Sequence, residues 1–190
     1  MPNNKSLVLE TERLILREFR EEDRRDVQEY RSDPAVVKYL PFEPATEEET
    51  KTLITKIIGF QKAQPRMVYN FALIDKKDDK VIGSCSLELS IDGDKQGEIG
   101  YVLNRNNWNQ GLMTECARKV ISFGFGQLGM HRIFGGCDPA NTASYRVMEK
   151  LGMQKEGHLR EHEFRKGAWR DILLYSILEH EWKKNNQYIS

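Results

Sequence analysis

Three strand-like segments follow one another in the middle of this chain, with only short polar turns between them. They cover residues 68–74, 81–90 and 98–103, and connections this short join antiparallel neighbours. An apolar-periodic helix begins at Gly111, and a further strand at residues 133–137 follows it. Because a helix separates the strands at 98–103 and 133–137, we expect them to lie parallel. The chain is therefore predicted to form one mixed sheet.

Other segments extend this sheet and cover it. Strands are predicted at residues 13–18, 153–163 and 168–178, the last two joined by a tight turn. Helices are predicted at residues 21–32, from Thr46 to Pro65 and from Asn141 to Gly152, since capping residues mark their starts and Pro or Gly their ends. The expected fold class is α+β, with a mixed, mostly antiparallel sheet of six to seven strands and helices on both faces.

Composition excludes several classes of protein. At 190 residues the chain is expected to be one domain, residues 1–190, with a structured core of about residues 7–182. Lys and Arg together number 29, as do Asp and Glu, so the net charge offers no general reason to bind nucleic acid. No apolar run approaches the roughly 20 residues of a membrane span. Residues 1–6 lack the apolar core of a signal peptide, so we expect a cytoplasmic protein without membrane partners.

The three cysteines, Cys85, Cys116 and Cys137, lie far apart in sequence and inside apolar segments. An odd number at such spacing fits reduced core thiols better than a disulfide or a zinc site. No metal site is predicted.

The segment Trp108-Asn109-Gln110-Gly111-Leu112-Met113-Thr114-Glu115 joins a strand to a helix. A glycine at the start of a helix lets the backbone come close to a ligand. The unpaired N–H groups and the positive end of the helix dipole suit a diphosphate. An ordinary strand-to-helix turn is the alternative that these eight residues leave open.

Five blocks in order resemble the GNAT superfamily of acetyl-CoA-dependent N-acetyltransferases, in the branch of bacterial ribosomal-protein N-terminal acetyltransferases. They are residues 11–17, 98–103, 108–115 and 138–152, and, as one closing block, residues 156–157 with 167–171. The resemblance covers nearly the whole chain and implies the GNAT fold, acetyl-CoA as cosubstrate and no metal. In the superfamily loop pattern, Trp108 and Met113 occupy the first and last positions, and Met113 is larger than the usual residue.

The resemblance also implies which residues bind the donor. Backbone amides of Tyr101, Val102 and Leu103 would pair with the pantetheine arm, which Asn141 and Ser144 would also contact. The diphosphate would lie on the loop and the first turn of the helix, formed by Trp108, Asn109, Gln110, Gly111, Leu112, Met113 and Thr114. From the residues alone, Asn141 also fits a helix N-cap, and the two roles can coexist.

Acetyl transfer needs a base for the amine and an acid or other stabilisation for the thiolate. The candidates are Glu98 as base, directly or through water, and Ser144 as acid. Glu98 also fits a solvent-facing strand residue, and His131 and His162 are further candidate proton acceptors. Many relatives carry a tyrosine acid near Met148, and methionine cannot donate a proton.

The expected function is acetylation of a primary amine in a ternary complex, most simply a protein N-terminal α-amine. A small-molecule amine (amino-sugar, polyamine or aminoglycoside) and a non-catalytic acyl-CoA sensor are the alternatives. Tyr39 and Phe42 lie in an apolar loop that either walls the acceptor channel or packs in the core. Dimers are frequent among relatives, which makes a homodimer an open alternative by analogy, and the sequence itself does not give the oligomeric state.

Overall fold

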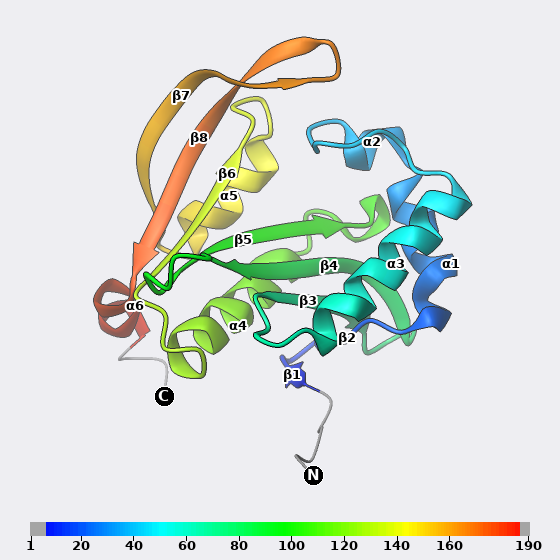
Figure 1. Ribbon diagram of the computed structural model, residues 1–190, viewed down its shortest axis with the longest axis horizontal. Coiled ribbons are helices and arrows are strands. Elements are labelled where there is room, and N and C mark those ends of the chain that lie inside the picture. Colours follow the sequence, from blue (N-terminus) through cyan, green and yellow to red (C-terminus); the bar gives the residue numbers. More distant parts are fainter. Residues whose placement is uncertain (1–6, 187–190) are drawn as a thin grey trace.

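Eight strands form one sheet in the computed structural model, which describes residues 7–186 (Figure 1). Their order across the sheet is β1-β2-β3-β4-β5-β6-β8-β7. Among the described strands only β5 and β6 run parallel, as the intervening helix predicted. The strands are β1 (Val8–Glu10), β2 (Leu14–Glu18), β3 (Val68–Asp75), β4 (Lys80–Leu89), β5 (Gln96–Leu103), β6 (Arg132–Cys137), β7 (Gln154–Arg165) and β8 (Ala168–Leu178).

Helices cover both faces of the sheet, which confirms the predicted α+β architecture (Figure 1). The α-helices are α1 (Arg24–Arg31), α2 (Pro34–Val37), α3 (Glu47–Lys62), α4 (Leu112–Gly126), α5 (Thr142–Lys150) and α6 (Glu179–Asn186). Two short 3-10 turns complete the helical segments. The first, η1 (Glu21–Asp23), directly precedes α1, and the second, η2 (Arg105–Asn107), lies between β5 and α4.

Alternation along the strands divides the apolar residues between two cores. Leu14 and Leu16 of β2 point into a large core with α4 and α5, whereas Ile15 packs with α1 and α3 on the opposite face. In β5, Ile99 and Leu103 belong to the first core and Val102 packs against the second. The side chains on the two faces of β5 therefore contact different cores.

The sheet has one strand more than the six to seven expected. The additional strand, β1, is three residues long and pairs with β2. A segment this short shows no alternation from which to recognise it. Two helices were also not predicted: α2 spans four residues, and α6 follows β8 without a break.

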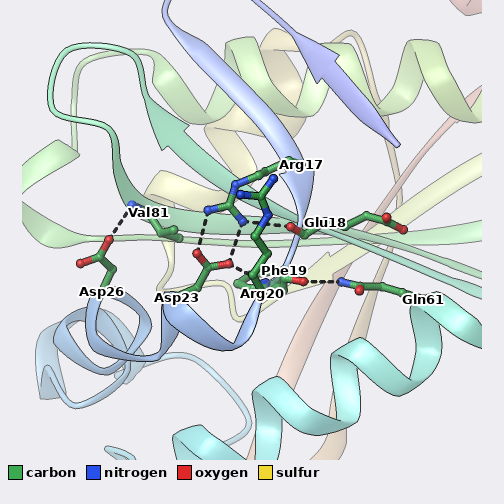
Figure 2. A network of polar contacts seen from close by, with 8 residues as sticks. All are labelled: Arg17, Glu18, Phe19, Arg20, Asp23, Asp26, Gln61 and Val81. Carbon is green, nitrogen blue, oxygen red and sulfur yellow. Dashed lines mark hydrogen bonds and ion pairs between the residues drawn. The ribbon is translucent and has the colours of Figure 1, made fainter. Parts of the chain in front are cut away.

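A polar network fastens η1 and α1 to the sheet (Figure 2). Both terminal nitrogens of Arg17 donate to the Asp23 carboxylate, at 2.8 and 2.7 Å, and the backbone N–H of Arg20 donates to the same carboxylate at 2.8 Å. Asp26 accepts from the backbone N–H of Val81 on β4 at 2.9 Å. The Asp23 carboxylate raises the pKa of Arg17, which therefore stays charged.

Within residues 7–186, no helix combines the length and apolar character needed to cross a membrane. The three cysteines are free and buried. No group of three or more potential metal-binding side chains occurs in the same described part of the chain.

The parallel ladder between β5 and β6 is short. Pairing begins at Gln96 with Arg132 and ends at Glu98 with Phe134, although β5 continues to Leu103. Beyond that point β6 stays paired with β8 up to Cys137 and diverges from β5 (Figure 1). The sheet is therefore split, with an unpaired edge of β5 at residues 99–103.

Candidate active site

A cleft of about 1040 Å³ occupies the split between β5 and β6. Its walls come from α2 and the loop after it, the second half of β5, the loop before α4, the end of β6 and the first turns of α5. All but one of the predicted site residues line it: Glu98, Tyr101, Val102, Leu103, Trp108, Asn109, Gly111, Leu112, Met113, Thr114, Asn141 and Ser144. Residues distant in sequence are thus brought to one cavity.

The loop before α4 takes a left-handed backbone at two positions, Asn109 (φ 59°) and Gly111 (φ 76°). Gly111 is the N-cap of α4 and offers no side chain to satisfy the first N–H groups of the helix. The first intrahelical bond runs from the N–H of Glu115 to the carbonyl of Gly111 at 3.1 Å. The N–H groups of residues 112–114 precede that bond and lie at the cleft, as an anion site requires.

Gln110 is the predicted cofactor residue that does not line the cleft. Its side-chain amide donates to the carbonyl of Asn106 at 3.2 Å, and its own carbonyl accepts from Arg13 at 2.9 Å. Both contacts lie outside the cleft lining, so the Gln110 side chain does not form part of the cleft wall.

Trp108 and Met113 line the part of the cleft next to the start of α4. The Trp108 indole N–H donates to the carbonyl of Leu103 at 2.8 Å, which holds the ring against the end of β5. Met113 is buried in the core beneath α4 as well as lining the cleft. Its size is therefore accommodated by the interior.

Ser144 and Tyr101 form a pair of hydroxyl groups inside the cleft. Ser144 Oγ donates to Tyr101 Oη at 3.2 Å, and Tyr101 Oη donates to the carbonyl of Ser144 at 2.9 Å. Burial raises the pKa of Tyr101, so the phenol stays protonated. Asn141 caps α5 by accepting from the N–H of Ser144 at 3.3 Å. This N-cap bond uses Oδ1 and not the amide nitrogen of Asn141, so an N-cap role leaves that nitrogen free to take a second role.

Cys137 lies at the end of β6, beside Ser144. Burial raises the pKa of its thiol to about 11, and a hydrogen bond with Ser144 opposes that shift. At this pKa the thiol stays protonated near neutral pH and is a poor nucleophile.

Glu98 lies where the β5–β6 pairing ends, on the face of β5 that Val102 also occupies. Its side chain reaches the cleft and remains exposed. Desolvation in the concave wall raises the pKa of this carboxyl. The like charges of Glu88, its partner on β4, and of Glu163 on β7 raise it further. A carboxylate with a raised pKa at a cleft suits a general base.

The structure also shows which of the other candidate residues line the cleft. His131 and His162 are exposed and lie outside the cleft lining. Met148 is buried and lines the cleft without a group that could donate a proton. Tyr39 lines the cleft, whereas Phe42 does not and packs under the Arg31 guanidinium, 4.0 Å from the ring centroid.

Several lining residues were not foreseen, among them Ala35 and Val36 of α2 and Arg165 of the β7–β8 turn. This turn reaches α2, because Lys166 Nζ donates to the carbonyl of Val37 at 2.9 Å. The turn was recognisable in sequence as Arg165-Lys166-Gly167, but its position over the cleft depends on this long-range contact. No local signal identifies it.

Comparison with known proteins agrees with this geometry. A family profile described as "Acetyltransferase (GNAT) domain" matches residues 13–154. The uncharacterized N-acetyltransferase YnaD of Bacillus subtilis is 37% identical over 172 residues, which cover 90% of this chain and 97% of that protein. The [ribosomal protein uS5]-alanine N-acetyltransferase of Escherichia coli is 25% identical over 182 residues, 92% of each chain.

A solved structure of similar sequence has the same fold. The GNAT-family acetyltransferase of Bacillus anthracis is 35% identical, with a TM-score of 0.82 over 92% of this chain and 100% of its own. The family profile covers most of the chain and includes β5, the glycine loop and the start of α5. The chain belongs to the GNAT family of acetyl-CoA-dependent N-acetyltransferases.

Proposed function

We propose that this enzyme acetylates the α-amine of a protein N-terminus in the cytoplasm, by direct transfer within a ternary complex. The observation that carries the proposal is that three elements of such a reaction face one cleft. They are the carboxylate of Glu98, the unpaired edge of β5 at residues 99–103 and the hydroxyl pair of Ser144 and Tyr101.

In this mechanism the N–H groups that begin α4 hold the donor diphosphate, and the free edge of β5 aligns the pantetheine arm. Glu98 accepts a proton from the acceptor ammonium, directly or through water. The amine nitrogen then bonds to the thioester carbonyl carbon, whose oxygen is stabilised by backbone N–H groups of residues 101–103. As the carbon–sulfur bond breaks, Ser144 gives its proton to the thiolate and takes up the second proton that the amine nitrogen loses. A neutral amide and a thiol are formed, and the Ser144 hydroxyl is restored. Tyr101 orients this hydroxyl.

Two cationic side chains of the cleft bear on the choice between a peptide and a polyamine. Lys38 and Arg165 line the same cleft as Glu98, and Arg165 forms an ion pair with Glu163. A polyamine brings several cations toward these two, whereas a peptide brings one ammonium group followed by neutral amides. The Escherichia coli relative is named as an acetyltransferase of an alanine of ribosomal protein uS5, which agrees with this choice.

The test is thiol release from acetyl-CoA with a panel of acceptors, with the products located by mass spectrometry. The panel contains peptides with a free N-terminus, the same peptides blocked at the α-amine, spermidine and an aminoglycoside. We expect acetylation of free peptides only, at the α-amine. Activity restricted to spermidine or the aminoglycoside would contradict the proposal and indicate a small-molecule acceptor. Tight binding of acetyl-CoA without transfer to any acceptor would instead favour the acyl-CoA sensor.

A further inference from the structure

The turn between β1 and β2 contacts the loop that precedes α4, although about a hundred residues separate them in sequence. The backbone N–H of Arg13 donates to Glu115 Oε1 at 3.0 Å, and Arg13 Nε donates to Glu115 Oε2 at 2.7 Å. Arg13 Nη1 donates to the carbonyl of Gln110 at 2.9 Å. One arginine therefore joins the first turn of α4 to the residue before Gly111.

These bonds act on the part of the loop with the least common backbone conformation. Gln110 lies between Asn109 and Gly111, both left-handed. Arg13 Nη2 lies 3.7 Å from the position that a Cβ on Gly111 would occupy, so the guanidinium lies directly against this glycine. The carbonyl of Gln110 belongs to the peptide that joins Gln110 to Gly111, so the bond from Arg13 holds this peptide in place. This fixes the direction of the N–H groups that follow.

Charge gives the pair a second role. Glu115 lies in the first turn of α4, where its carboxylate would repel a bound diphosphate. Arg13 Nη2 lies 2.6 Å from Glu115 Oε2, and this ion pair neutralises the carboxylate. Burial alone would raise the pKa of Glu115, but hydrogen bonds from Thr11 and Arg13 keep it below its usual value. Glu115 is thus ionised, and its charge depends on Arg13 for compensation.

We propose that Arg13 and Glu115 are positioning residues for the donor. They hold the loop at residues 108–111 in the shape that presents the N–H groups of residues 112–114 to the diphosphate of acetyl-CoA, and they keep that site free of net negative charge. The inference rests on the proposed role of this loop in binding the donor. It assigns a task to Arg13 of the Thr11-Glu12-Arg13-Leu14 segment, which lies outside the cleft lining.

The experiment compares two donors, acetyl-CoA and S-acetylpantetheine, which carries the thioester but no diphosphate. For Arg13→Met we expect kcat/KM with acetyl-CoA to fall about tenfold or more through KM, with kcat nearly unchanged. With S-acetylpantetheine, kcat/KM should stay within about twofold of the unmodified enzyme. Adding Glu115→Gln to Arg13→Met should recover part of the loss with acetyl-CoA, because it removes the uncompensated carboxylate.

Arg66→Met is the matched control. Arg66 pairs with Glu18 at 2.6 Å, at the other end of β2, and is at least as buried as Arg13. We expect no selective effect on acetyl-CoA. Calorimetric titration with CoA tests the pair independently of the acceptor, and Arg13→Met should raise the Kd about tenfold.

Equal losses with both donors would show that Arg13 only supports the fold, and unchanged CoA affinity in Arg13→Met would also overturn the proposal. Failure of the unmodified enzyme to acetylate any peptide would contradict the proposed acceptor instead. The CoA titration would still decide the role of the pair.

Discussion

At the scale of single residues, the neighbours of Glu98 give its carboxyl a pKa above its usual value. It faces Glu88 across the β4–β5 ladder and Glu163 from β7, and its pKa is raised by desolvation and by both charges. A base must be ionised to accept a proton. The active fraction of the enzyme should therefore decline as pH falls through this raised pKa.

Glu88→Gln tests that electrostatic argument. Removing one like charge stabilises the ionised form of Glu98, so the pKa of Glu98 should fall. The acidic limb of the kcat/KM profile should shift to lower pH, measured with an acceptor whose own amine titrates well above that limb. Glu98→Gln should remove the limb and lower kcat/KM by about 100-fold or more. An unshifted limb in Glu88→Gln would mean that another group titrates there.

The hydroxyl pair leads to a separate prediction. Tyr101→Phe removes the acceptor of the Ser144 Oγ hydrogen bond and leaves the ring in place. We expect kcat to fall about tenfold with little change in KM for acetyl-CoA, because only the orientation of the acid is lost. Ser144→Ala should lower kcat at least as far. If both variants keep the full kcat, the thiolate leaves without help from this pair.

At the scale of elements, α1 depends on a buried ion pair. Asp23 is only 5% exposed and accepts two hydrogen bonds from Arg17. Asp23→Asn leaves the guanidinium uncompensated and should lower the free energy of unfolding by about 3 kcal/mol, measured by urea denaturation. Glu48→Gln is the control, since its pairing with Lys51 is exposed and should contribute less than about 1 kcal/mol. Similar losses in both variants would contradict a special role for the Arg17 network.

Elements with a long repeating pattern were predictable from sequence. The strand expected at residues 168–178 coincides with β8, and the helix after Gly111 coincides with α4. In both, apolar side chains recur at the spacing of one buried face. β1 and α2 show no such recurrence, because segments of three and four residues are too short for apolar side chains to repeat on one face. β1 is defined by its pairing with β2, and α2 by the Asp33 N-cap and the proline that follows it.

The position of a candidate site residue was predictable where that residue begins a helix. Gly111 and Asn141 are N-caps in the structure, and both line the cleft. Charges that arrive from distant elements were not predictable in the same way. Glu163 and Arg165 follow an irregularity in β7, where the register with β8 shifts between Leu159 and Glu163. A register shift changes which side chains share one face of the hairpin, and a linear sequence pattern does not reveal it.

At the scale of the whole molecule, the donor is expected to bridge two parts of the sheet. One wall of the cleft belongs to β5 and α4, and the other to β6 and α5. A ligand that binds only the folded state at 100 times its Kd adds about 2.7 kcal/mol of stability. For a chain of this size, CoA should raise the Tm by about 5–10 °C in differential scanning calorimetry. No increase at saturating CoA would contradict a donor site in the split.

The early end of the β5–β6 ladder has a consequence for anyone who alters this enzyme. Paired strands satisfy the hydrogen-bonding N–H and C=O groups of each other's backbone. Here the pairing stops at Glu98 and Phe134. Selection for heat resistance alone can favour substitutions that extend the pairing of β5 with β6 beyond these residues. The cleft between the two strands would then close. Such a variant would be more stable but would have no room for the donor, and it would be inactive. Selection for stability should therefore be done with CoA present, so that only variants that keep the opening are favoured.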